Sequence, residues 1–174
     1  MSPFVAAIAF LAVVFLYMRS IYVRLADLCS AGDSLWSDID EMLSMRHDLV
    51  AALVETVEKH GACEKRILDR VGEVREEAMR ATTPSERSRA ESVLQSTLES
   101  LFALAENCHE LQSSESFIEQ EKQLAYLGNR IRYARTNYNA VIRELNARID
   151  TAPGRLIANL VKYRKREYFE LDNP

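Results

Sequence analysis

The first two dozen residues are almost wholly apolar, whereas the rest of the chain mixes apolar and polar positions at helical spacing. An uninterrupted apolar run extends from Phe4 to Met18. A membrane-spanning helix needs about 20 apolar residues, and the run reaches this length if residues 21–23 are included and Arg19 extends its charge to the headgroups. We therefore predict a transmembrane anchor over residues 1–24. Its apolar side chains include Phe4, Phe10, Phe15 and Met18.

A cleaved signal peptide is the main alternative for this segment. No Lys or Arg precedes the apolar run and no small-x-small cleavage site follows it, so an uncleaved anchor is favoured. A lipidated Cys29 is disfavoured because the preceding residue, Leu28, is too bulky for such a site.

Charge predicts the orientation of the span. Arg19 and Arg24 follow the apolar run, and no basic side chain precedes it. The positive-inside rule then places the N-terminus outside and the domain of residues 25–174 in the cytoplasm. The three cysteines are odd in number and lack the spacing of a disulfide framework, as expected of reduced thiols.

Residues 25–174 carry apolar positions about 3.5 residues apart, as in helices that pack side by side. The first such seam is Trp36, Ile39, Leu43, Arg46, Val50, Leu53, Val57, His60, Glu64, Ile67, Val71, Val74 and Ala78. The second is Ala90, Leu94, Leu98, Leu101, Leu104, Cys108 and Leu111. The third is Phe117, Leu124, Leu127, Ile131, Ala134, Tyr138, Val141, Leu145 and Ile149. Because these seams must face one another, we predict an all-α domain: an antiparallel up-and-down bundle of three to four long helices plus a short C-terminal helix.

Local signals predict where these helices begin and end. Pro84 and Pro153 cannot lie in a helix interior, so both mark boundaries. Thr83 and Glu86 flank Pro84 as the two halves of a capping box, which predicts a helix start there. The serine-rich stretch 113–116 predicts another break, since serines compete with helical backbone bonding.

Helix length adds a constraint. A straight helix over residues 33–81 would be about 70 Å long, whereas residues 85–111 would cover only about 40 Å. Either the first helix breaks near Gly61, or part of it meets another protomer or another surface. The seam stays in phase across Gly61, which favours a bend over a full loop. On this basis we expect Trp36 and Ile39 to lie at contacts between protomers.

Several short motifs resemble those of one known family. In the first half they are Trp36-Ser37-Asp38-Ile39-Asp40, Arg46-His47-Asp48-Leu49-Val50 and Leu53-Val54-Glu55-Thr56-Val57. In the second half they are Asn129-Arg130-Ile131, Ala134-Arg135, Tyr138-Asn139, Asn146, Ile149, Pro153, Leu156-Ile157-Ala158 and Arg166-Glu167-Tyr168-Phe169-Glu170. In order and spacing, residues 20–170 resemble the LemA family.

This resemblance implies a protein of the bacterial inner membrane with one N-terminal span and a cytoplasmic helical bundle. It implies no enzymatic activity, because none is established for the family. The chain resembles a divergent member. The family usually has asparagine where Val23 stands, proline at Ala51 and histidine at Cys63. It usually has a Tyr-Pro pair in place of Cys108-His109 and glutamate in place of Gly128.

Arg46 lies on the first apolar seam, and a buried arginine requires carboxylate partners. We expect a charge network inside the bundle that fixes its register. Its candidate carboxylate partners are Asp38, Asp40 and Glu64, with Arg130 or Arg135 as a further cation. Asp48 is a separate candidate for a structural or interaction role. The His47-Asp48 pair also occurs in metal-dependent phosphohydrolases, but the three histidines of the chain are too few for such a site.

Other candidate chemistry is weaker. His60, Cys63, Cys108 and His109 have the composition of a zinc site, but adjacent residues of one helix point about 100° apart and do not easily reach one ion. We therefore predict no metal and no cofactor. Tyr133, Tyr138, Asn137, Asn139 and Asn146 decorate the third long helix, where core packing is favoured over a binding groove.

The segment after Pro153 is amphipathic, with leucines followed by the basic run 162–166. Docking onto the bundle is favoured for it, while contact with anionic lipid or with another protomer stays open. Nucleic acid is disfavoured as a partner, because the chain has a net charge of −4.

No phosphate-binding loop, nucleophile elbow, CxxC or HExxH motif occurs in the sequence. We expect a membrane-anchored, non-enzymatic scaffolding protein that contacts lipid through its N-terminal helix and self-associates. The alternative is a monomeric adaptor that recruits another membrane protein, such as a protease or a stress-response component.

Overall fold

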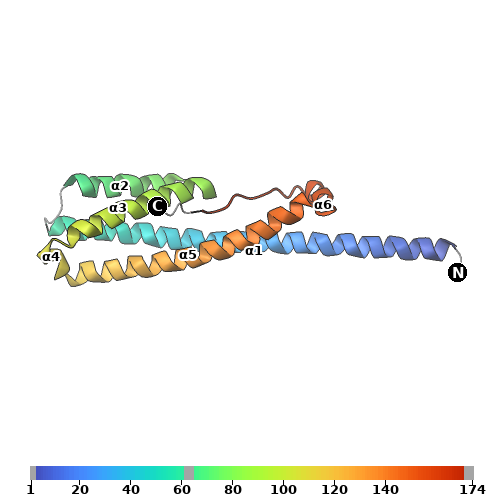
Figure 1. Ribbon diagram of the computed structural model, residues 1–174, viewed down its shortest axis with the longest axis horizontal. Helices are drawn as coiled ribbons and strands as arrows, with labels where there is room; N and C mark the ends of the chain where they lie inside the picture. The colour runs from blue at the N-terminus through green and yellow to red at the C-terminus, as the bar shows by residue number, and fades with distance from the viewer. Residues whose placement is uncertain (1–2, 61–64, 171–174) are drawn as a thin grey trace. The chain divides into compact units, whose positions relative to one another are not determined.

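The computed structural model describes residues 3–60 and 65–170. The helices in this part of the chain are α1 (Pro3–Lys59), α2 (Lys65–Arg80), α3 (Pro84–Ala105), α4 (His109–Gln112), α5 (Glu115–Asp150) and α6 (Gly154–Val161), shown in Figure 1. These residues contain no strand, so the prediction of an all-α fold is confirmed. By its contacts the chain divides into two compact units, one of residues 1–36 with 137–166 and one of residues 37–136 with 167–174.

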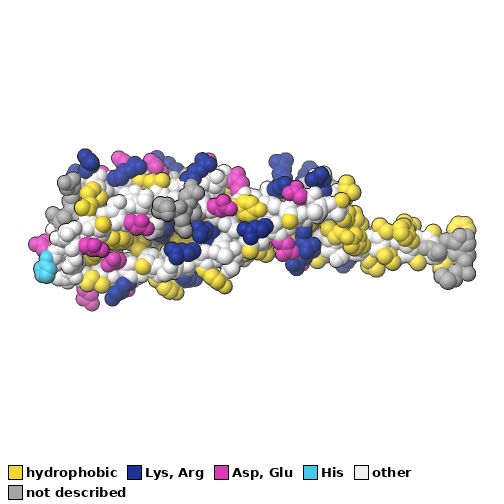
Figure 2. Space-filling model, in the orientation of Figure 1, with side chains coloured by type: hydrophobic (Ala, Val, Ile, Leu, Met, Phe, Trp, Pro, Cys, Tyr) yellow, Lys and Arg dark blue, Asp and Glu magenta, His cyan; other side chains and the backbone are white. Residues whose placement is uncertain are grey.

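The N-terminal part of α1 is an apolar helix without a protein partner on most of its surface. The helix is long and apolar enough to cross a membrane, and only 6% of its most apolar window is buried. Phe4, Phe10 and Phe15 are exposed and Met18 is half-buried. Figure 2 shows hydrophobic side chains along this segment. Burial begins at Leu25, one residue after the predicted end of the anchor, and α1 continues through that position without a break.

In the unit of residues 37–136, the chain reverses direction after α1. The guanidinium Nε of Arg75 in α2 donates to the backbone oxygen of His47 in α1 at 2.6 Å, so residues equally far from the connection lie side by side. The two helices therefore form an antiparallel hairpin. The break expected near Gly61 is confirmed, since α1 ends at Lys59 and α2 begins at Lys65, whereas the expectation of a bend there is wrong. An apolar seam that stays in phase across the connection is compatible with a bend and with a hairpin, because in both geometries each helix turns its apolar face toward the core. Gly61 itself lies outside the described residues.

The core of this unit is built from the predicted apolar seams, except that one buried position in α3 lies one residue later than predicted. Val50, Leu53 and Val57 of α1 pack with residues of α2, α3, α4 and α5. Ala105 is buried in place of the predicted Leu104, which is exposed, because α3 ends at this point and residues 106–108 separate it from α4. The predicted continuous helix up to Leu111 is therefore interrupted.

In the unit of residues 1–36 and 137–166, α5 lies antiparallel to α1. The Trp36 and Tyr138 ring centroids are 5.4 Å apart. A Cβ added at Gly32 would lie 3.1 Å from Ile142 Cδ1, so glycine permits close approach of the helices there. Ile142 is fully buried and Val141, predicted for the seam, is only half-buried.

In the same unit, the side chain of Asn146 on α5 holds the segment that follows α6. The amide of Asn146 pairs with the backbone of Arg166, accepting from its N–H at 3.0 Å and donating to its carbonyl oxygen at 2.9 Å. The Arg166 guanidinium lies 2.5 Å from the Asp33 carboxylate. The segment after α6 therefore docks on its own unit, as the favoured interpretation of the tail predicted.

The capping box predicted before α3 is confirmed. The hydroxyl of Thr83 accepts from the Glu86 backbone N–H at 3.2 Å, and the Glu86 carboxylate accepts from the Thr83 backbone N–H at 3.2 Å. Both bonds satisfy amides that have no partner within the helix.

Thr83→Ala should lower the free energy of unfolding by about 1 kcal/mol, since it removes the cap of α3. Urea unfolding of the detergent-solubilised protein measures this loss. Ser100→Ala removes a hydroxyl in the interior of the same helix and is the matched control. An equal loss in both variants would contradict the assignment of the cap.

The same motif predicts a pH dependence. Hydrogen bonds from the backbone of Thr82 and Thr83 lower the pKa of Glu86. The resulting stabilisation is complete above the unfolded-state pKa of about 4.3 and is lost as the pH falls through the lower folded-state pKa. Glu86→Gln does not titrate, so the stability advantage of the native protein over this variant should shrink in acid. A difference in unfolding midpoint that stays constant from neutral pH to acid would contradict this.

Candidate functional site

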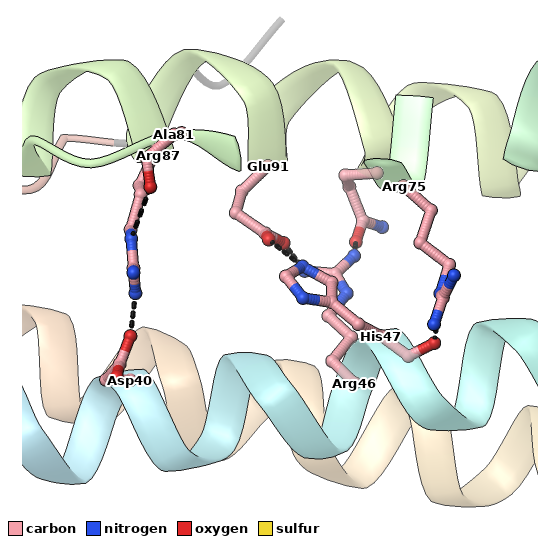
Figure 3. A network of polar contacts seen from close by, with 8 residues as sticks. Asp40, Arg46, His47, Arg75, Ala81, Arg87 and Glu91 are labelled. Carbon is pink, nitrogen blue, oxygen red and sulfur yellow. Dashed lines mark hydrogen bonds and ion pairs between the residues drawn. The ribbon is translucent and has the colours of Figure 1, made fainter. Parts of the chain in front are cut away.

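Two adjacent side chains of α1 turn into the bundle and meet α3. Arg46 and His47 both bind Glu91, whose side chain is only 1% exposed. His47 Nε2 lies 2.6 Å from Glu91 Oε1, and Arg46 Nη1 lies 3.4 Å from Glu91 Oε2. Arg46 also donates to Gln95, one turn further along α3. Figure 3 shows these side chains converging between the two helices.

A second polar contact ties the same helices together beside this cluster. The Arg87 guanidinium of α3 pairs with the Asp40 carboxylate of α1, and its Nε donates to the Ala81 backbone oxygen at 3.0 Å. With the bond from Arg75 to His47, these contacts link α1, α2 and α3 at three places (Figure 3).

The electrostatics of the cluster follow from its burial. Burial lowers the pKa of the Arg46 guanidinium, and the Glu91 carboxylate opposes that effect. Arginine nevertheless stays protonated in proteins. Arg46 is therefore a buried positive charge, and Glu91 is the carboxylate that balances it.

The cluster lacks the relay that nucleophilic catalysis needs. In such relays a serine or cysteine donates to the histidine nitrogen that the carboxylate leaves free. Ser88 is buried one turn before Glu91, but its hydroxyl has no hydrogen-bond partner among the described residues. The arrangement can hold a charge pair and fix a helix register.

A cavity of about 400 Å³ lies beside the cluster. A Cβ added at Gly128 would meet nothing within 4 Å, so the wall of the cavity is open at this position. Its walls combine charged and polar side chains with apolar ones. The lining residues are Arg46, Ser92, Gln95, Ser96, Leu98, Glu99, Phe102, Glu121, Leu124, Ala125, Gly128, Asn129, Ile131, Arg132 and Arg135.

The structure revises the predicted membership of the charge network. Arg46 is buried as expected, and Arg135 lines the same cavity. The predicted carboxylate partners are wrong: Asp38 is exposed and Asp40 pairs with Arg87, because both lie more than a helical turn from Arg46. Glu64 lies outside the described residues.

The remaining predicted site residues are not joined to this cluster. Asp48 is exposed, and Arg130 lies outside the cavity, 5.9 Å from the centre of the Tyr126 ring. Asn139 is half-buried and Tyr138 is buried against Trp36. Ile39 is fully buried within the fold, so it is not available for the predicted contact between protomers.

Sequence reasoning missed Glu91, His47 and Gln95. A signal for Glu91 exists, because it precedes the seam residues Leu94, Leu98 and Leu101 at the same spacing. The prediction took Ala90 instead because it is apolar. Among the described residues no group of His, Cys, Asp and Glu side chains could hold a metal ion, and Cys63 of the zinc hypothesis lies outside them.

The fold and this network define the class of the protein: a helical bundle with a buried charge cluster, continuous with a helix that is a candidate membrane span. The model of the LemA family matches residues 35–174, so the chain belongs to the LemA family. The match begins after the apolar segment. No curated protein matches the chain significantly.

Glu91→Gln should destabilise the protein by about 3–5 kcal/mol, because it leaves the buried Arg46 charge without a counterion. Glu77→Gln is the matched control, since Glu77 is an exposed carboxylate on α2. Urea unfolding measures both. Replacing Arg46 and Glu91 together by methionine should recover most of the loss, and an unchanged stability of Glu91→Gln would show that Glu91 is not the counterion on which the buried Arg46 depends.

Proposed function

We propose that this protein is a membrane-anchored, non-enzymatic scaffold of the bacterial inner membrane that self-associates through its helical bundle. The observation that carries the proposal is the uncovered apolar surface of α1, which ends where burial in the bundle begins. Lipid is the solvent that suits such a surface. Arg19 and Arg24 at its C-terminal side support a cytoplasmic bundle and an external N-terminus.

The self-association surface we propose lies on α5. Tyr126 and Tyr133 are 64% and 72% exposed, and their spacing of seven residues places both on one face of the helix. Arg130 lies between them, over the Tyr126 ring. Tyrosine and arginine are the side chains that interfaces favour.

This surface replaces the predicted one at Trp36 and Ile39, whose side chains pack within the chain. Confinement to a membrane raises the effective concentration, so even a weak contact of this kind would populate an oligomer.

A second candidate function, a monomeric adaptor, is favoured by the cavity beside Arg46. Its volume of about 400 Å³ suits one or two side chains of a partner. The two proposals differ in whether the protein assembles alone.

The mass of the full-length protein in detergent distinguishes them. We expect a discrete oligomer, and Tyr126→Ala combined with Tyr133→Ala should yield the monomer mass. Met79→Ala with Val93→Ala, which removes two exposed apolar side chains from α2 and α3, is the matched control and should leave the oligomer intact. A native protein that is monomeric throughout would overturn the scaffold and favour the adaptor.

A further inference from the structure

The short helix α6 has apolar side chains on two faces. Ile157 and Ala158 are buried against their own unit, as expected of a docked helix. Leu156 and Leu160, one turn apart, are 66% and 84% exposed. Two neighbouring leucines left in water forgo the gain of burial, so the outer face of α6 is unmatched within the described chain.

The register of α1 and α5 places α6 at the end of the anchor. Within their unit the helices run antiparallel, with Trp36 beside Tyr138 and Gly32 beside Ile142. Asp150, where α5 ends, lies about 12 Å beyond Ile142 along the axis, which brings it level with residue 24. The predicted anchor ends at this residue, so α6 begins at the level where the bilayer surface is expected.

Contacts after α6 agree with this placement. Burial raises the pKa of Tyr163, and the nearby Tyr22 and Cys29 raise it further. Tyr22 belongs to the aromatic pair, with Tyr17, that is typical of a membrane interface. Arg24 at the end of the anchor lies 2.9 Å from the Glu144 carboxylate of α5.

Charge is divided unevenly between the two units. The unit that contains α6 and the anchor has nine basic and four acidic side chains, a net charge of +5. The other unit has thirteen basic and twenty-two acidic side chains, a net charge of −9. The overall charge of −4 is therefore the sum of a basic unit, which contains the candidate span and α6, and an acidic unit.

Part of this basic charge is not neutralised by the protein. Lys165 pairs with Asp150 at 2.6 Å and Arg166 pairs with Asp33. Lys162 and Arg164 are exposed and make no ion pair within the described residues. Figure 2 shows Lys and Arg side chains gathered where the apolar stretch of α1 ends.

We propose that residues 154–165 form a second membrane contact, with Leu156 and Leu160 at the acyl boundary and Lys162 and Arg164 on anionic lipid headgroups. Apolar insertion and headgroup attraction are the two terms that hold interfacial helices on a bilayer. The occupant is lipid and not a protein because this surface adjoins the candidate span and carries the charge that anionic lipid complements. This proposal rests on the proposed anchor.

The test reports on α6 in the full-length protein. Leu160→Trp is reconstituted into vesicles of phosphatidylcholine with phosphatidylglycerol, and brominated phosphatidylcholine serves as the quencher of tryptophan fluorescence. The added tryptophan should be quenched. Leu104→Trp, the same change at an exposed leucine of α3, is the matched control and should not be.

Charge is tested in the same assay. Lys162→Gln and Arg164→Gln should each weaken the α6 contact about fivefold, since a basic residue near an anionic surface is worth about 1 kcal/mol. Arg66→Gln, exposed on α2, should have no effect. Equal quenching in vesicles of phosphatidylcholine alone would overturn the role of anionic headgroups.

Alkaline carbonate extraction of the same vesicles tests the anchor separately, because it measures whether the protein stays in the membrane. Protein that is retained while Leu160→Trp is quenched supports both proposals. Retained protein with an unquenched Leu160→Trp overturns the α6 contact and leaves the anchor standing, and a second copy or another protein would then cover the leucines. Protein that is extracted overturns both.

Discussion

The buried pair of Arg46 and Glu91 constrains the bundle in a way that its apolar contacts do not. Leucines and valines repeat along each seam, so sliding one helix past another by two turns would still bury apolar side chains against apolar side chains. The same slide would separate the two charges and leave both in a medium that penalises unpaired ions. Because His47 also binds Glu91, and Arg75 binds the His47 backbone, the register of α1 against α3 also positions α2.

The sequence predicts the helices well because periodicity and caps are local properties. The burial of Ile39, Leu43, Val50 and Leu53 follows from a 3.5-residue repeat, and the start of α3 follows from Thr83 and Glu86. The turn after Lys59 could not be predicted, since a seam in phase does not report whether the next helix continues or returns. The shift from Val141 to Ile142 arises because a straight helix drifts from a strict heptad, whereas Ala105 keeps the heptad because it lies seven residues after Leu98.

The sequence predicts the buried cation of the candidate site but not the carboxylate that balances it. A seam position occupied by Arg46 indicates a buried charge, and a buried charge requires a counterion, so the existence of the network follows from one residue. The identity of the counterion of Arg46 cannot be predicted from that residue, because the nearest acidic residues in the sequence point elsewhere and Glu91 belongs to another helix. An acidic residue at a seam position is the matching signal, and an apolar criterion for the seam discards it.

The division of charge bears on the proposed membrane contact. A single span fixes the distance of a domain from the bilayer but leaves it free to rotate about the axis of the span. The net positive charge of the unit that contains the proposed span would be attracted to an anionic surface, and this attraction acts within a Debye length of about 8 Å. Only side chains within about that distance of the headgroups contribute. At the proposed membrane end these include Arg19 on the span itself and Lys162 and Arg164 after α6, whereas the buried charge of Arg46 is already balanced by Glu91. A second contact through α6 would therefore fix the rotation of its own unit about the axis of the span.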